Sequence, residues 1–247
     1  MNRLLLLALL LLAPGAAWAQ SVSIDLGAGG QAGATGRLVQ LTALLTVLSL
    51  APSLLVIGTA FTRIVIVLSL LRSAIGAQGT PPNSVLIGLS LFLTFYVMQP
   101  TMELAWVNGL VPLTQGAIPE MEGLTRTAAP FHAFMAANAR PPDIQLFLDL
   151  AQLPPVPGPE QTPWRALVPA FMIGELRRAF EMGFLLYMPF LVIDLVVGSV
   201  LMSLGMMMLP PNAVSLPFKL IFFVIVDGWR LVAGSLVQGF APGVSGG

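Results

Sequence analysis

The stretch PAFMIGELRRAFEMGFLLYMPFLVIDLVVGSVLMSLGMMMLPPNAVSLPF, residues 169–218, decides the fold of this chain. Between residues 182 and 218 only Asp194 is charged, and three consecutive methionines stand shortly before a double proline (Met206, Met207, Met208). Beyond it lie Lys219, the only lysine, and a second apolar run over residues 220–226. The pattern predicts two apolar helices joined by a stiff, sulfur-rich turn.

The composition indicates a membrane-associated protein. Of 247 residues, 56% are hydrophobic and 9% are charged, whereas soluble domains are about 45–50% apolar and about 25% charged. The formal net charge of zero argues against a nucleic-acid partner, which requires a basic surface. The lack of cysteine and the single histidine, His132, argue against thiolate or histidine metal sites and catalytic triads. We expect no enzyme activity, no catalytic residue, no cofactor and no metal.

The first residues have the pattern of a secretory signal peptide. Arg3 precedes an apolar run over residues 4–12, and Ala-Trp-Ala ends at residue 19. Such a run is too short to cross about 30 Å of hydrocarbon, so we favour a cleaved signal peptide over residues 1–19 rather than an uncut membrane helix. Residues 20–36 are rich in glycine and alanine and predict a flexible linker.

The rest of the chain predicts an all-α, membrane-associated fold of two long kinked hairpins with an insertion of short helices. The first hairpin (37–110) has helices at 38–50, 53–72 and 85–102, with the break at Pro52. The insertion (111–163) holds five of the eleven acidic residues, helices at 120–137 and 142–152 and a proline-rich loop, and is expected outside the cytoplasm.

The second hairpin (164–240) is predicted to have helices at 164–204 and 213–240, kinked at Pro189 and Pro217, before a disordered tail at 241–247. Helices of about forty residues exceed a simple membrane span. They are therefore expected to pack against protein rather than lipid. Gly183, Gly198 and Gly205 would allow close helix contacts.

The few charges in the apolar segments are the first candidates for a site. Arg63 stands alone in its segment, and we favour a buried role for it over a side chain reaching the headgroups. Opposite charges lie three or four positions apart, which places them on one helix face. These are the pairs Glu175 and Arg178, Arg177 and Glu181, and Asp227 and Arg230. As with Arg63, we expect Asp194, Asp227 and Arg230 to be buried charges.

Asp194 and Lys219 have no partner nearby in the sequence. An unpaired charge in an apolar environment is costly. Lys219 therefore either pairs with an acid from another segment or another copy of the chain, Glu175 and Asp194 being the candidates, or lies at a headgroup boundary. The methionine run leaves two interpretations open as well: ordinary core filling, or a deformable apolar seal for a channel.

Two long stretches resemble the FliP family, flagellar biosynthesis proteins of the type III export gate. They are residues 169–211, followed by SLPFKLIFFVIVDGWRLVAGSL (215–236), and FTRIVIVLSLLRSAIGAQGTPPNSVLIGLSLFLTFYVMQP (61–100). The likeness covers residues 38–240. One departure is Gly174, where the family pattern has us expect a serine.

The resemblance implies a non-enzymatic, multi-pass subunit of the bacterial inner membrane and flagellar basal body, with a cleaved signal peptide. Five copies would assemble with FliQ and FliR into a helical cone, next to FlhA and FlhB and in contact with membrane lipid. Unfolded flagellar proteins would pass through the channel. The methionines at 206–208 would seal it when closed, and Glu175 and Lys219 would meet between neighbouring subunits.

Two other functions are alternatives. The same subunit could serve a virulence injectisome, although those relatives usually lack a signal peptide. A small-solute transporter would show inverted repeats and polar groups at the membrane midplane, and the two halves of this sequence show no such symmetry.

Overall fold

The computed structural model describes residues 41–42, 45–46, 49, 52–77, 79–206 and 208–240. The expected signal peptide (1–19), linker (20–36) and tail (241–247) lie outside these residues, as does most of the expected helix at 38–50. By its contacts the chain divides into two units, residues 1–49 and 50–247. All labelled elements belong to the second unit, where the described residues form helices and no strand. The predicted all-α class is therefore confirmed.

The first hairpin has a bend that was not predicted, whereas residues 50 and 51, next to the predicted break at Pro52, lie outside the described residues. The helix Pro52–Gly58 is followed by α3 (Phe61–Ile75) at an angle of 82°, so the helix expected at 53–72 is not continuous. Threonines hold the bend: Thr62 Oγ1 donates to the carbonyl of Val56 at 2.7 Å, and Thr59 Oγ1 accepts from the amide of Phe61 at 3.3 Å. The break thus lies where side chains can replace lost backbone hydrogen bonds.

The second apolar helix is longer than predicted. Gly76 ends α3 with a left-handed φ of 80°, a conformation that favours glycine. α4 (Asn83–Ala105) then continues through a π-helical turn, η1 (Trp106–Leu110), into α5 (Val111–Thr114). Pro100 lies inside α4 without ending it.

The two short helices of the insertion are confirmed. α6 (Glu120–Asn138) has two acids in its first turn, where the helix dipole favours negative charge. α7 (Pro141–Leu150) begins with prolines, which are tolerated there because the first turn needs no amide donors. A 3₁₀ turn, η2 (Pro159–Gln161), lies in the proline-rich loop that follows.

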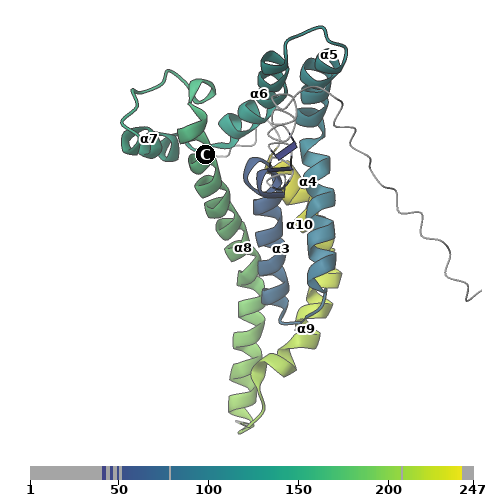
Figure 1. Ribbon diagram of the computed structural model, residues 1–247. Helices are drawn as coiled ribbons and strands as arrows, with labels where there is room; N and C mark the ends of the chain where they lie inside the picture. Colours follow the sequence, from purple (N-terminus) through teal and green to yellow (C-terminus); the bar gives the residue numbers. More distant parts are fainter. Residues whose placement is uncertain are drawn as a thin grey trace, which may run out of the picture. The chain divides into compact units, whose positions relative to one another are not determined.

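α8 (Trp164–Ser203) has the most extensive contacts of the labelled elements, and its predicted extent is confirmed. Its 40 residues measure about 60 Å at about 1.5 Å per residue. Figure 1 shows α8 beside α3, with α7 against its beginning and α9 (Pro211–Ile225) returning from its end. Gly183 lies where α3 crosses closely, since a Cβ there would collide with Leu70.

The last helix also bends away from the predicted position. Pro217 lies inside α9, and the chain turns by 63° between α9 and α10 (Gly228–Gln238). Asp227 adopts a left-handed φ of 52° at this point. A Cβ on Gly228 would collide with the ring of Phe223, so the turn is set by glycine and by tertiary packing rather than by proline.

Two hydrophobic cores lie along α8. One joins α3, α4, α9 and α10 and includes Ile64, Leu68, Phe190 and Leu236. The other joins α6, α7 and the first turns of α8. The helices Asn83–Thr114 and Trp164–Ser203 are long and apolar enough to cross a membrane. Two bent pairs, Pro52–Gly58 with α3 and α9 with α10, are also long and apolar enough if each pair is counted as one broken span.

Candidate functional site

Arg63 forms the centre of a buried charge cluster at the start of α3. Its Nε donates to Oε2 of Glu175 at 2.8 Å, and its Nη2 donates to Oε1 of the same carboxylate. Nη1 donates to the carbonyl of Gly239 at 3.0 Å, and the guanidinium stacks 3.6 Å from the ring centre of Phe240. Because the fork is bidentate and both partners are buried, the cluster fixes α3, α8 and the end of α10 relative to one another.

Glu175 also faces a second arginine. Arg178 lies 3.6 Å from its carboxylate and donates to the carbonyl of Asn138, at the end of α6, at 2.9 Å. The spacing of three predicted this contact. Arg177 and Glu181, four apart, form an exposed pair at 2.7 Å, of the kind that contributes little to stability.

Lys219 has its partner within the same chain. Its ammonium group, 5% exposed, donates to Oδ2 of Asp194 at 2.6 Å and to the carbonyl of Ala74 at 3.0 Å. The hydroxyl of Ser215 donates to the other oxygen of Asp194 at 2.5 Å. These bonds tie α9 to α8 and to the end of α3. The contact between Glu175 and Lys219 of neighbouring copies stays a prediction, since within the chain each has a different partner.

Asp227 and Arg230 do not form a pair in this chain. Both are exposed, and the ion pairs found in the described part of the chain do not include them. They were expected to be buried charges. Only a partner surface could bury them, so that role stays a prediction about an assembly.

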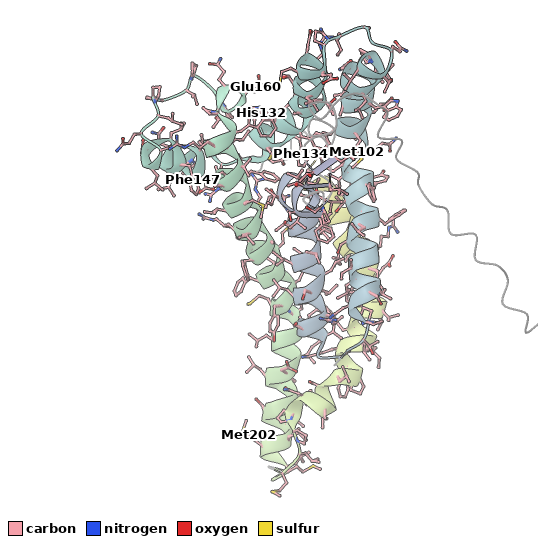
Figure 2. All side chains as sticks on the ribbon, in the orientation of Figure 1. Met102, His132, Phe134, Phe147, Glu160 and Met202 are labelled. Carbon is pink, nitrogen blue, oxygen red and sulfur yellow. The ribbon has the colours of Figure 1, made fainter. Side chains whose placement is uncertain are left out.

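The methionine turn projects from the end of the α8–α9 pair. Gly205 has a left-handed φ of 72°, the side chain of Met208 is 97% exposed and that of Met206 is 44% exposed. Met207 lies outside the described residues. Figure 2 places Met202, also exposed, on the last turns of α8 that lead into this turn. Within one chain the two described methionines therefore do not serve as core filling.

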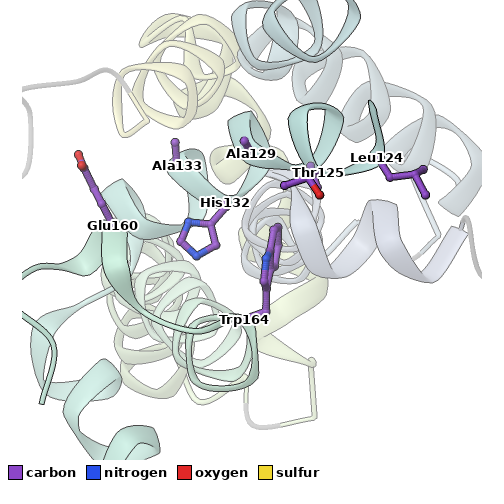
Figure 3. Close-up of a pocket in the computed structure, with 8 residues that line it drawn as sticks. Leu124, Thr125, Ala129, His132, Ala133, Glu160 and Trp164 are labelled. Atoms are coloured by element: carbon purple, nitrogen blue, oxygen red, sulfur yellow. The ribbon is translucent and has the colours of Figure 1, made fainter. Parts of the chain in front are cut away.

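Sequence reasoning missed the role of the single histidine. Its Nε2 donates to the carbonyl of Thr162 at 2.8 Å, and its ring meets Trp164 edge-on at 4.8 Å between centres. Figure 3 shows the ring of His132 between Glu160 and Trp164 in a pocket of about 640 Å³. His132 thus joins α6 to the segment before α8, a link between residues thirty positions apart that no local pattern signals.

These features define a class of protein: a helical protein of the membrane-spanning type, whose interior charges are paired and whose longest apolar helix is largely exposed. The chain belongs to the FliP family, whose sequence model matches residues 44–236. The resemblance seen in the sequence is thereby confirmed.

Close relatives carry the name flagellar biosynthetic protein FliP. The protein of that name from Caulobacter vibrioides is 57% identical over 234 residues, covering 94% of this chain and 87% of the relative. The one from Agrobacterium fabrum is 48% identical over 240 residues, covering 96% and 98%. The one from Bacillus subtilis is 49% identical over 202 residues, covering 82% and 91%.

Proposed function

We propose that this chain is a pore-forming core subunit of the flagellar type III protein export gate, crossing the bacterial inner membrane several times within the flagellar basal body. Membership of the FliP family and relatives named for flagellar biosynthesis support this role over one in a virulence injectisome. Five copies would assemble with FliQ and FliR into a helical cone beside FlhA and FlhB, and unfolded flagellar proteins would pass through it.

The observation that supports a pore-forming role is the exposed methionine turn at the end of exposed apolar helices. Much of the surface of α8 beyond Ala179 is apolar and uncovered, including Phe184, Leu185 and Leu195. Such a surface needs lipid or protein neighbours. Lateral packing of copies along α8 would gather their methionine turns into one ring, where unbranched thioether chains can close an irregular opening.

The seal is tested by replacing Met206, Met207 and Met208 together with alanine. The assembled gate should then conduct ions at rest, measured as current across a planar bilayer or as ion leakage from cells. Met121→Ala is the matched control, because the side chain of Met121 is also exposed but lies on α6. Unchanged leakage in a gate of verified assembly would remove the seal from the proposal.

The predicted contact between copies is tested by charge exchange at Lys219. Lys219→Glu should block assembly, and Glu175→Lys in the same chain should restore it in part if the two residues meet between neighbours, since this change also removes the counter-ion of Arg63. Asp194→Lys combined with Lys219→Asp instead tests the pair at 2.6 Å inside one chain. If only the second combination restores assembly, the role of Lys219 is to hold α9 against α8 within one chain. The readout is the size of the purified complex together with swimming motility.

A further inference from the structure

A polar pocket of about 550 Å³ opens between the α3–α4 turn, the middle of α8 and the first turn of α9. Its lining includes Arg72, Asn83, Tyr187, Asn212 and Lys219. Its lining shares no residue with the Arg63 cluster or the methionine turn, and the proposed pore makes no use of Arg72 or Tyr187.

Arg72 is a cation without a counter-ion. Its Nη1 donates to the carbonyl of Pro81 at 3.3 Å and to Oδ1 of Asn83 at 2.5 Å, whereas no carboxylate of the described residues lies within ion-pair distance. The other described cations without a carboxylate, Arg165 and Arg230, are exposed, while Arg72 is half-buried. A half-buried charge in so apolar a protein favours an anion from outside the chain.

The neighbouring acid cannot supply that anion. Asp194 lies in the pocket wall, but its two oxygens accept from Lys219 at 2.6 Å and from Ser215 at 2.5 Å. Aspartate and lysine thus neutralise each other. Arg72 is left as the uncompensated charge of the pocket, with its Nε and Nη2 donors free of any hydrogen bond to described residues.

Two helix N-termini add to the attraction for an anion. Asn83 is the first residue of α4 and Asn212 the second residue of α9, and both line the pocket. Helix N-termini carry partial positive charge and unbonded amide groups. The C-terminal end of α3 opposes an anion, but Arg72 stands in its last turn and offsets that effect.

An apolar track leaves the pocket along α8. Tyr187, Leu191 and Leu195 follow one another at intervals of four residues and are all exposed, so they form one stripe on the helix face. This combination of a cationic pocket and an adjoining exposed apolar helix suits a molecule with a phosphate at one end and acyl chains at the other.

We propose that this pocket binds the phosphate of an anionic phospholipid, with the acyl chains lying along the stripe of α8. The free Nε and Nη2 edge of Arg72 matches the bidentate geometry of a phosphate, and the Tyr187 hydroxyl is a further donor.

The test is native mass spectrometry of the assembled complex, delipidated and then supplied with equal amounts of dioleoylphosphatidylglycerol and dioleoylphosphatidylcholine. The wild type should retain phosphatidylglycerol about tenfold over phosphatidylcholine, because the choline cation cancels the phosphate charge that Arg72 attracts, and tenfold is the scale of one charge-assisted contact. Arg72→Gln should abolish that preference. Arg177→Gln should leave it unchanged, because Arg177 is an exposed α8 arginine that is already paired with Glu181.

Arg72 also holds the α3–α4 turn, so a variant that cannot disturb folding is needed. Tyr187→Phe removes a hydroxyl that makes no hydrogen bond within the described part of the chain, and should lower the amount of phosphatidylglycerol retained several-fold. Equal retention of both lipids by the wild type, or unchanged retention of phosphatidylglycerol in both pocket variants, overturns the proposal. Inorganic phosphate at millimolar concentration is the second arm. Thermal stabilisation by phosphate without any lipid preference would indicate a site for free anions and would also overturn it.

Discussion

Replacing Gly174 with serine should stabilise this protein, because the structure leaves a buried acceptor unpaired opposite that position. Oδ2 of Asp143 is buried without a hydrogen-bond partner, and its nearest cation, Nη1 of Arg140, is 3.8 Å away. A Cβ on Gly174 would lie 3.6 Å from this oxygen and 3.8 Å from Cγ of Arg140, which is ordinary contact. A serine hydroxyl there can reach the oxygen at an O···O distance of about 2.5–3.0 Å.

The magnitude follows from two contributions. A hydrogen bond to a charged group is worth about 1.5–3 kcal/mol, and exchanging glycine for serine inside a helix gains about 0.5 kcal/mol. The free energy of unfolding should rise by about 2–3 kcal/mol. For a chain of this size that corresponds to roughly 5–10 °C in melting temperature. The assay is thermal unfolding of the purified protein in detergent, followed by tryptophan fluorescence.

Gly198→Ser provides the matched control. Gly198 lies in the same helix, and a Cβ there meets nothing within 4 Å, so only the propensity gain of about 0.5 kcal/mol applies. In a chain that already carries Asp143→Ala, adding Gly174→Ser should likewise raise the free energy of unfolding by only about 0.5 kcal/mol. A Gly174→Ser protein no more stable than the control, or a gain that survives the loss of Asp143, would refute the reasoning.

Three other substitutions test the packing around α8. Glu175→Gln leaves the buried Arg63 without its counter-ion and should cost about 3–5 kcal/mol, seen as a lower melting temperature and a lower yield of folded protein. Gly183→Ala should cost about 1–3 kcal/mol because its Cβ collides with Leu70, and Leu70→Ala in the same chain should recover part of that loss. Phe240→Leu removes the ring 3.6 Å from the Arg63 guanidinium and should cost about 1–2 kcal/mol, measured by the same unfolding assay.

Their controls are residues of the same type in open surroundings. Arg177→Gln breaks an exposed pair and should change stability by less than about 1 kcal/mol. Gly198→Ala should be neutral or stabilising. Comparable losses in the control and test variants would mean that burial and close packing are not the cause.

The candidate site was predictable only in part. The exposed methionine turn follows from composition and from the glycine and prolines that flank it, because these are properties of a short stretch. The partners of the charges were not predictable from spacing: Arg63 and Glu175 are 112 positions apart, and Lys219 and Asp194 are 25 apart. For Lys219 the sequence narrowed the choice to two acids, and the fold selected one within the chain. No pattern in the sequence marked Arg72 as a site residue, because its lack of a counter-ion is evident only once the carboxylates have been located in the structure.

The sequence by itself determined that this chain is helical, apolar and built around residues 164–240, because composition and helix propensity act over one or two turns. It did not determine where the helices bend. The bend after Gly58 was not predicted, and α9 continues through Pro217 to a bend at Asp227. Those positions were decided by tertiary structure: threonine side chains satisfy the backbone at the first bend, and the Phe223 ring packs against the glycine at the second. A helix bends where the lost backbone bonds find other partners and the packing improves, and both conditions depend on which side chains the folded chain brings to the bend.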